Sequence, residues 1–150
     1  MRAFLALPVP DAVRTAAARL QEELRRAGAD VGWTRPEQMH LTIKFLGEIE
    51  PAAAARFAER LTASLPRRPV ELEYAGLLRE TRPFSPHLTL GRIRSPRHLK
   101  ALEAAMEARA DVVLGRGAAS ELILYESTLG AQGAVHEPLR RFPLRPPTEA

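Results

Sequence analysis

Residues 40–43 read His-Leu-Thr-Ile, and residues 87–90 read His-Leu-Thr-Leu. The chain has only four histidines, and two of them begin this short pattern. From ordinary residue usage, a given histidine would be followed by Leu-Thr-aliphatic roughly once in a thousand times. Chance does not account for two copies among four histidines, so the repeat is the feature from which we predict both fold and function.

Each copy of the motif has the pattern of a β-strand, in which successive side chains point to opposite faces. Each would therefore place its imidazole and its hydroxyl on one face and its two aliphatic side chains on the other. Two such strands facing each other would bring two imidazoles and two hydroxyls to one cavity. We expect His40 and His87 to flank that cavity.

This set of side chains suits the hydrolysis of a phosphodiester. A neutral histidine can take a proton from water, a protonated one can give a proton to the leaving oxygen, and hydroxyls can bind the non-bridging oxygens. Histidine suits both tasks because its ordinary pKa lies near neutrality.

Other interpretations of the histidines remain open at this point. A single copy could be a half-exposed histidine beside a good strand-forming residue. Two histidines can bind zinc, but no carboxylate or cysteine recurs at matching offsets, and threonine is a poor ligand. The Gly-x-Ser-x-Gly turn of a serine hydrolase is absent from the sequence.

The composition is that of one domain with a substantial core. Of the 150 residues, 45% are hydrophobic and 27% are charged, and we expect a single domain over residues 1–150. With no cysteine, disulfides, thiolate nucleophiles and Cys-ligated zinc are ruled out, and a reducing cytoplasm is compatible. The net charge of +4, almost all from arginine, permits an anionic substrate such as an RNA end, although an arginine-rich coding bias would give the same excess.

Apolar periodicity and turn residues predict an alternation of strands and helices. The N-terminal residues are too short a stretch for a secretory signal, and no apolar run is long enough to cross a bilayer. No glycine-rich phosphate loop follows a strand, which favours a mixed α+β fold. We predict strands at 3–7, 31–33, 39–46, 70–74, 86–92, 121–127 and 141–144, and helices at 11–28, 51–65 and 95–106.

The extended motifs resemble the 2H phosphoesterase superfamily, and in particular its RNA 2′,3′-cyclic phosphodiesterase branch, often labelled 2′-5′ RNA ligase. The resemblance is carried by the block His-Leu-Thr-Ile-Lys-Phe-Leu-Gly at 40–47 and by Arg-Pro-Phe-Ser-Pro-His-Leu-Thr-Leu-Gly-Arg at 82–92. It extends to residues 2–8, Trp33 and 124–130.

The resemblance implies a two-lobed α+β fold, with antiparallel sheets around a central cleft, helices outside and one motif in each lobe. It also implies a further loop, strand and helix after Gly76, which this sequence does not contain. Either the protein lacks that unit or the sequence is not contiguous there. Its absence would leave the lobe that holds His40 with an incomplete sheet or an exposed edge.

The same resemblance assigns roles to the motif residues. His40 would be the general acid that protonates the departing 3′ oxygen, and His87 the general base that activates water. Thr42 and Thr89 would bind the phosphate.

Further residues fall at matching positions around the motifs. Phe45 and Arg92, each five residues after its histidine, match positions that contact the base and the phosphate, although strict alternation would turn both away from the site. Lys44 lies on the His40 face by alternation and is a secondary candidate for phosphate. Ser127 matches a family serine, and Trp33 could stack on a base or lie in the core. We expect His98 to be a surface residue, and we assign His136 no role.

The sequence therefore predicts an enzyme that hydrolyses RNA-terminal 2′,3′-cyclic phosphate to a 2′-phosphate, without metal or cofactor. The alternatives are reversible 2′-5′ RNA ligation by the same histidines and an RNA-end or nucleotide-binding module without turnover. We expect a cytoplasmic monomer whose partners are RNA ends or cyclic nucleotides, with no membrane association.

Overall fold

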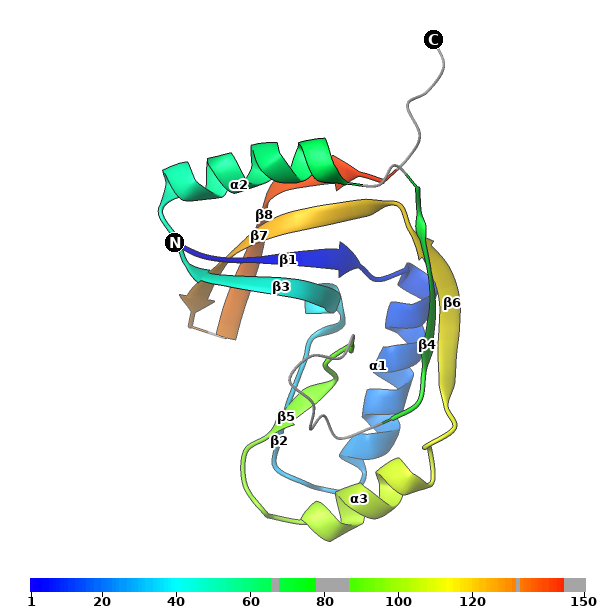
Figure 1. Ribbon diagram of the computed structural model, residues 1–150. Coiled ribbons are helices and arrows are strands. Elements are labelled where there is room, and N and C mark those ends of the chain that lie inside the picture. The colour runs from blue at the N-terminus through cyan, green and yellow to red at the C-terminus, as the bar shows by residue number, and fades with distance from the viewer. Residues whose placement is uncertain (66–67, 78–86, 132, 145–150) are drawn as a thin grey trace. The chain divides into compact units, whose positions relative to one another are not determined.

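The computed structural model describes residues 1–65, 68–77, 87–131 and 133–144 of the chain. Strands, α-helices and one short 3₁₀ helix are interleaved along these residues (Figure 1). None of the helices in these ranges is both long and apolar enough to cross a membrane. The strands are β1 (Arg2–Pro8), β2 (Val31–Trp33), β3 (His40–Glu48), β4 (Val70–Ala75), β5 (Gly91–Ile93), β6 (Val113–Ala119), β7 (Glu121–Gly130) and β8 (Gly133–Pro143); the helices are α1 (Asp11–Arg25), η1 (Pro36–Gln38), α2 (Pro51–Ser64) and α3 (Leu99–Glu107).

The chain forms two compact units that alternate along the sequence. The His40 unit consists of Met1–Pro8, His40–Glu71 and Ala118–Ala150, and the His87 unit consists of Val9–Met39 and Leu72–Gly117. Neither unit is a continuous stretch of chain, so the two are not successive sequence domains. The single domain over residues 1–150 stays a prediction.

The His40 unit is built on a four-stranded antiparallel sheet with the strand order β3-β1-β7-β8. Residues Ala3–Leu7 of the inner strand β1 are all at most 5% exposed, which explains why this strand is apolar on both of its faces. In the register, Leu5 pairs with Leu124 and Leu7 with Leu41. These leucines share one face of the sheet, and Phe4 and Ala6 share the other.

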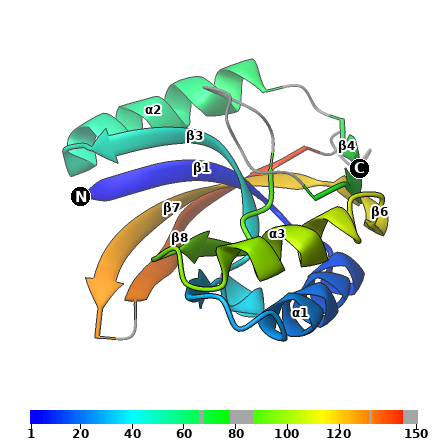
Figure 2. The same cartoon turned by 90° about the horizontal axis from the view of Figure 1, so that it is seen from below.

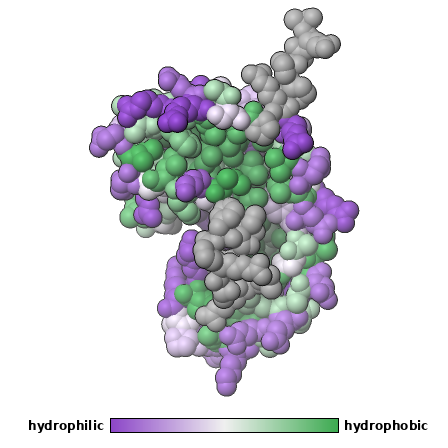
Figure 3. Space-filling model, viewed as in Figure 1, coloured by the Kyte–Doolittle hydropathy of each residue, from purple (hydrophilic) through white to green (hydrophobic). Residues whose placement is uncertain are grey.

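Helix α2 lies along one face of this sheet (Figures 1 and 2). Its buried residues are Ala54 and Ala58, whose small side chains allow the helix to approach the strands closely. We infer that α2 covers the leucine face. Arg56 and Arg60 are exposed on the helix, and Figure 3 shows that side of the unit as hydrophilic.

The His87 unit packs around helix α1. The helical spacing of Val13, Ala17, Leu20 and Leu24 places all four side chains in its core. One group, the Tyr74 cluster, contains Val9, Val13 and Tyr74, and a second, the Leu102 cluster, contains Leu20, Leu24 and Leu102. The β2–β5 ladder belongs to this unit, as does most of the β4–β6 ladder.

The mixed α+β class and the antiparallel sheets that we predicted are confirmed. Helices α1 and α2 begin at the expected residues, although α1 ends at Arg25, before Gly28. Among the described residues β3 forms one edge of its sheet, and the incomplete sheet in the His40 lobe stays a prediction.

Four details of the sequence prediction are wrong. Helix α3 begins at Leu99, because the preceding residue His98 adopts a left-handed conformation that ends any helix starting at Ser95. Strand β6 was not predicted, and the last strand is 133–143 instead of 141–144. The predicted strand 86–92 is not continuous, since β5 covers only Gly91–Ile93. Residue 86 lies outside the described residues.

Candidate active site

The first motif lies at the start of β3, and its pairing with β1 decides which side chains share a face. Thr42 pairs with Ala6, and Phe45 pairs with Phe4. Because Ala6 and Phe4 are two positions apart on β1, Thr42 and Phe45 point to the same face, although they are three positions apart on β3. The register shift between Leu5 and Ala6 marks a bulge in β3 that makes this possible. It resolves the conflict with strict alternation for Phe45.

The same bulge reverses the expectation for Lys44. Lys44 pairs with Leu5, whose side chain belongs to the leucine face, and not with a residue of the His40 face. The prediction that Lys44 shares a face with His40 is therefore wrong, because it assumed an uninterrupted alternation along β3. Lys44 itself is exposed.

Aromatic rings surround His40. Its ring stacks on Phe4, with ring centroids 4.8 Å apart and an interplanar angle of 29°. Phe4 is buried and also contacts Tyr125 at 5.2 Å and Phe45 at 5.8 Å. A stacked neighbour of this kind restrains the plane of the imidazole. Phe45 is 63% exposed and is accessible to a ligand on the same face.

His136, to which the sequence assigned no role, lies next to His40. The two rings meet edge-to-face with centroids 5.1 Å apart, and His136 contacts Phe4 at 4.9 Å. Its Nδ1 atom is buried without a hydrogen-bond partner among the described residues. Burial lowers the pKa of His136, which favours its neutral form beside His40. Nothing in the local sequence of β8 could have revealed this contact.

The second motif is held by its aliphatic residues. Leu88 packs against the Tyr74 cluster, and Leu90 packs against the Leu102 cluster. His87 and Thr89 flank Leu88 in the chain, and Thr89 is partly buried. His87 is exposed. The leucines of the second motif are thus packed in the unit, and its histidine is accessible.

A buried amide on α1 fixes the backbone of the second motif. Gln21 is 2% exposed, and its Nε2 donates hydrogen bonds to the carbonyl oxygens of Thr34, at 2.7 Å, and Leu90, at 2.8 Å. The backbone N–H of Thr34 donates to the same Leu90 oxygen at 2.9 Å. Gln21 lies within an otherwise apolar helix face, and this polar interruption is the signal that could have identified it.

Arg92 lies on the outward side of the β2–β5 ladder. It pairs with Gly32, and the flanking residues Val31 and Trp33 pack against the Leu102 cluster. The Arg92 side chain therefore points away from that cluster, and so would a side chain at Gly32. Since Leu90 packs toward it, alternation breaks between Leu90 and Arg92. As for Phe45, strict alternation along the chain does not give the direction of the fifth residue after the histidine.

The remaining candidates have simpler environments. Ser127 pairs with His136 in the β7–β8 ladder, so their side chains share a face. Trp33 packs in the core of its unit with the Arg25 guanidinium 5.5 Å from its ring, which favours its structural interpretation. His98 is exposed, as expected.

The fold and the sequence both have known relatives. RNA 2′,3′-cyclic phosphodiesterase of Methanocaldococcus jannaschii is 26% identical, and the alignment covers 95% of this chain and 100% of that protein. The enzyme of the same name from Methanothermobacter thermautotrophicus is 25% identical, over 96% and 99% of the two chains. The apo form of E. coli LigT superimposes with a TM-score of 0.70 at 21% identity, over 97% and 98% of the two chains.

The alignment with the first relative spans 178 residues, more than the 150 of this chain. That relative therefore contains residues that this chain lacks; a missing loop, strand and helix after Gly76 stays a prediction. The family model of LigT-like phosphoesterases matches residues 7–81, which is half of the chain and includes the first motif. This chain therefore belongs to the LigT-like phosphoesterase family.

Proposed function

We propose that this protein hydrolyses RNA-terminal 2′,3′-cyclic phosphate to a 2′-phosphate, with His40 and His87 as its acid and base. The observation that carries the proposal is that each unit holds one copy of the motif, with His40 and Thr42 on the face of the sheet opposite the leucines and His87 exposed. The two copies are held by unrelated contacts. The names of the archaeal relatives support the substrate class.

In the proposed reaction, His87 accepts a proton from water as the water oxygen bonds to phosphorus. The bond from phosphorus to the 3′ oxygen breaks, and His40 donates a proton to that oxygen. Thr42, Thr89 and Arg92 bind the non-bridging oxygens, on which negative charge grows in the transition state. Exposed Phe45 contacts the terminal base. Lys44 has no part in this scheme, since it lies on the other face of its strand.

The proposal requires both imidazoles at one phosphate, and the test is the identity of the product. RNA ending in 2′,3′-cyclic phosphate should be converted to RNA ending in 2′-phosphate, resolved from the 3′ isomer by chromatography. A 5′-hydroxyl RNA added as acceptor separates the alternatives. Joined strands as the main product would indicate a ligase, and tight binding without any product would indicate a binding module.

Chelation tests the proton-transfer scheme. Among the described residues, no three His, Cys, Asp or Glu side chains gather where they could hold a metal ion. Because the proposed steps use proton transfer alone, we expect turnover to survive exhaustive treatment with EDTA. Loss of turnover that zinc or magnesium restores would contradict the scheme.

A further inference from the structure

The outward side of the β2–β5 ladder carries a second arginine beside Arg92. The side chain of Arg94 folds back over Gly32, the residue that pairs with Arg92. A Cβ atom on Gly32 would lie only 2.8 Å from Nη2, 2.9 Å from Nε and 3.1 Å from Cζ of Arg94. The missing side chain of Gly32 therefore makes room for the guanidinium, on the same face as Arg92.

These two arginines differ from others in the chain. Arg109 bonds to Glu23, Arg116 to Glu73 and Arg141 to Glu121, and each of those pairs neutralises an arginine. Within the described ranges, neither Arg92 nor Arg94 takes part in an ion pair. Both are exposed, so two uncompensated positive charges share one face.

The backbone sets the spacing of the two arginines. The N–H of Arg94 donates to the carbonyl oxygen of Asp30 at 2.9 Å, which continues the pairing with β2 beyond Ile93. Two residues of a strand span about 6.6 Å, a distance comparable to that between successive phosphates of an extended nucleic acid strand. A guanidinium can hold a phosphate through two parallel hydrogen bonds.

We propose that Arg94, held by the gap at Gly32, binds the phosphate that precedes the terminal cyclic phosphate in a single-stranded RNA. This inference rests on the proposed function, in which Arg92 binds the terminal group. It predicts that the preferred substrate is an RNA of at least two nucleotides and that a cyclic mononucleotide is a poorer substrate. The contact is to the backbone and is independent of base sequence.

The test compares two substrates with the same terminal base, a 2′,3′-cyclic mononucleotide and a trinucleotide ending in 2′,3′-cyclic phosphate. The wild-type protein should show the higher kcat/KM on the trinucleotide. The ratio of kcat/KM on the trinucleotide to kcat/KM on the mononucleotide should fall by about 10- to 100-fold in Arg94→Ala, the usual value of a hydrogen bond to a charged group. Arg97→Ala, which removes a nearby exposed arginine, is the matched control and should leave the ratio unchanged.

Gly32→Ala tests the orientation of the side chain separately from its charge. Gly32 does not have a positive φ, so the variant keeps the backbone and displaces only the end of Arg94. It should lower the ratio less than Arg94→Ala does. In the double variant, Gly32→Ala should add nothing further, because its effect acts through Arg94. Additive effects would contradict the proposed arrangement.

Binding keeps the inference testable if turnover is absent. Fluorescence anisotropy would measure the affinity of the labelled trinucleotide for wild-type, Arg94→Ala and Arg97→Ala proteins over a range of salt. Loss of one phosphate contact should reduce the slope of log affinity against log salt by about 0.7, for Arg94→Ala alone. Equal changes in both variants would overturn the inference and leave the proposed function standing. Absence of turnover with a selective Arg94 effect would overturn the function alone.

Discussion

The two copies of the motif are held in their units by different means. His40 lies in a nine-residue strand that pairs with β1 along its length, and aromatic rings restrain its side chain. The segment that contains His87 enters a ladder fully only at Gly91, and Gln21 holds its backbone through the Leu90 carbonyl oxygen. Ring stacking holds the first imidazole, whereas the second motif is held by two packed leucines and a hydrogen bond to its backbone.

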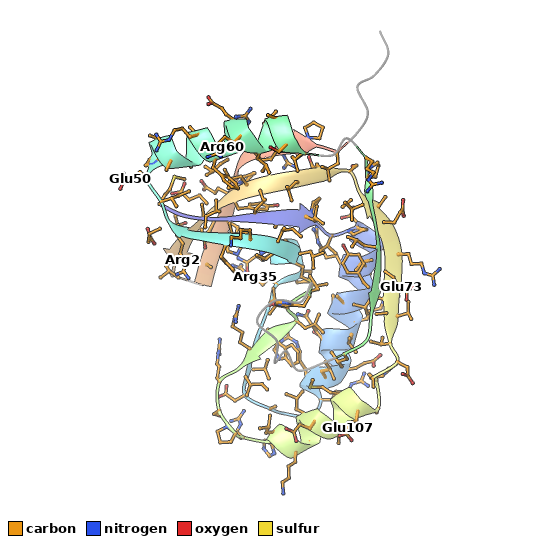
Figure 4. The ribbon with its side chains drawn as sticks, viewed as in Figure 1. Arg2, Arg35, Glu50, Arg60, Glu73 and Glu107 are labelled. Atoms are coloured by element: carbon orange, nitrogen blue, oxygen red, sulfur yellow. The ribbon has the colours of Figure 1, made fainter. Side chains whose placement is uncertain are left out.

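The difference shows that a repeated chemical motif does not require a repeated structural support. Arg2 belongs to the surroundings of the first motif, and Figure 4 shows it on the side of the sheet away from α2. Its partner Ser127 pairs in turn with His136, so residues of several strands contribute to the surroundings of His40. The second motif is held instead by Gln21 of α1 and by the packing of Leu88 and Leu90 in two clusters.

The largest expected effect separates the chemical roles of the two histidines. His40→Ala and His87→Ala should each lower the rate by about 10²–10⁴, the usual contribution of a general acid or base. A substrate with a much better leaving group needs no acid, so it should rescue His40→Ala and not His87→Ala. The measurement is kcat/KM on both substrates. Rescue of His87→Ala alone would exchange the two roles, and equal rescue would refute the assignment.

Gln21→Met tests the backbone support of the second motif. The variant keeps the volume but leaves the Thr34 oxygen without its donor, so the free energy of unfolding should fall by about 1–3 kcal/mol. Urea denaturation measures this, with Arg19→Met on the exposed side of the same helix as control. The rate of hydrolysis should also fall where the fold is intact, because Thr89 precedes the residue that Gln21 holds. Unchanged turnover would show that the hydrogen bonds support the fold alone.

His136→Phe tests the ring cluster through its pH dependence. Because burial lowers the pKa of His136 in the folded protein, the unfolded chain takes up the proton first as pH falls below about 6.5. The free energy of unfolding should therefore fall with pH in this window, and the wild type should lose more stability between pH 7 and pH 5 than the variant does. Denaturation at both pH values measures the difference. Parallel losses would mean that His136 protonates freely in the folded state.

The smallest expected effect concerns Tyr74 in the His87 unit. Its hydroxyl is buried without a hydrogen-bond partner among the described residues, and burial raises the pKa of that hydroxyl. Tyr74→Phe removes an unsatisfied polar group and should leave the free energy of unfolding unchanged or raise it by up to about 1 kcal/mol. A clear loss of stability in urea denaturation would show that the hydroxyl has a partner in the folded protein.

The prediction of Phe45 and Arg92 shows how far sequence reasoning reached into the site. Their equal offsets from the two histidines singled them out, whereas strict alternation turned both away. The bulge near Ile43 returns Phe45 to the face of Thr42, and alternation also breaks between Leu90 and Arg92. A bulge forms through pairing with a particular partner strand, so the local sequence does not predict it. Lys44 was misplaced for the same reason.

The sequence by itself determined the elements whose signals are local. The apolar periodicity of Val13 to Leu24 and the proline at residue 51 identified α1 and α2, and the repeated His-Leu-Thr pattern identified the paired motif. Only the tertiary structure decided what surrounds each motif. Strand β8, with Pro138 at the irregularity opposite Tyr125, has no regular alternation and forms because β7 offers it a partner. His136 and His40 lie in strands β8 and β3 of one sheet, with β1 and β7 between them, and the contact of their rings depends on residues far apart in the chain.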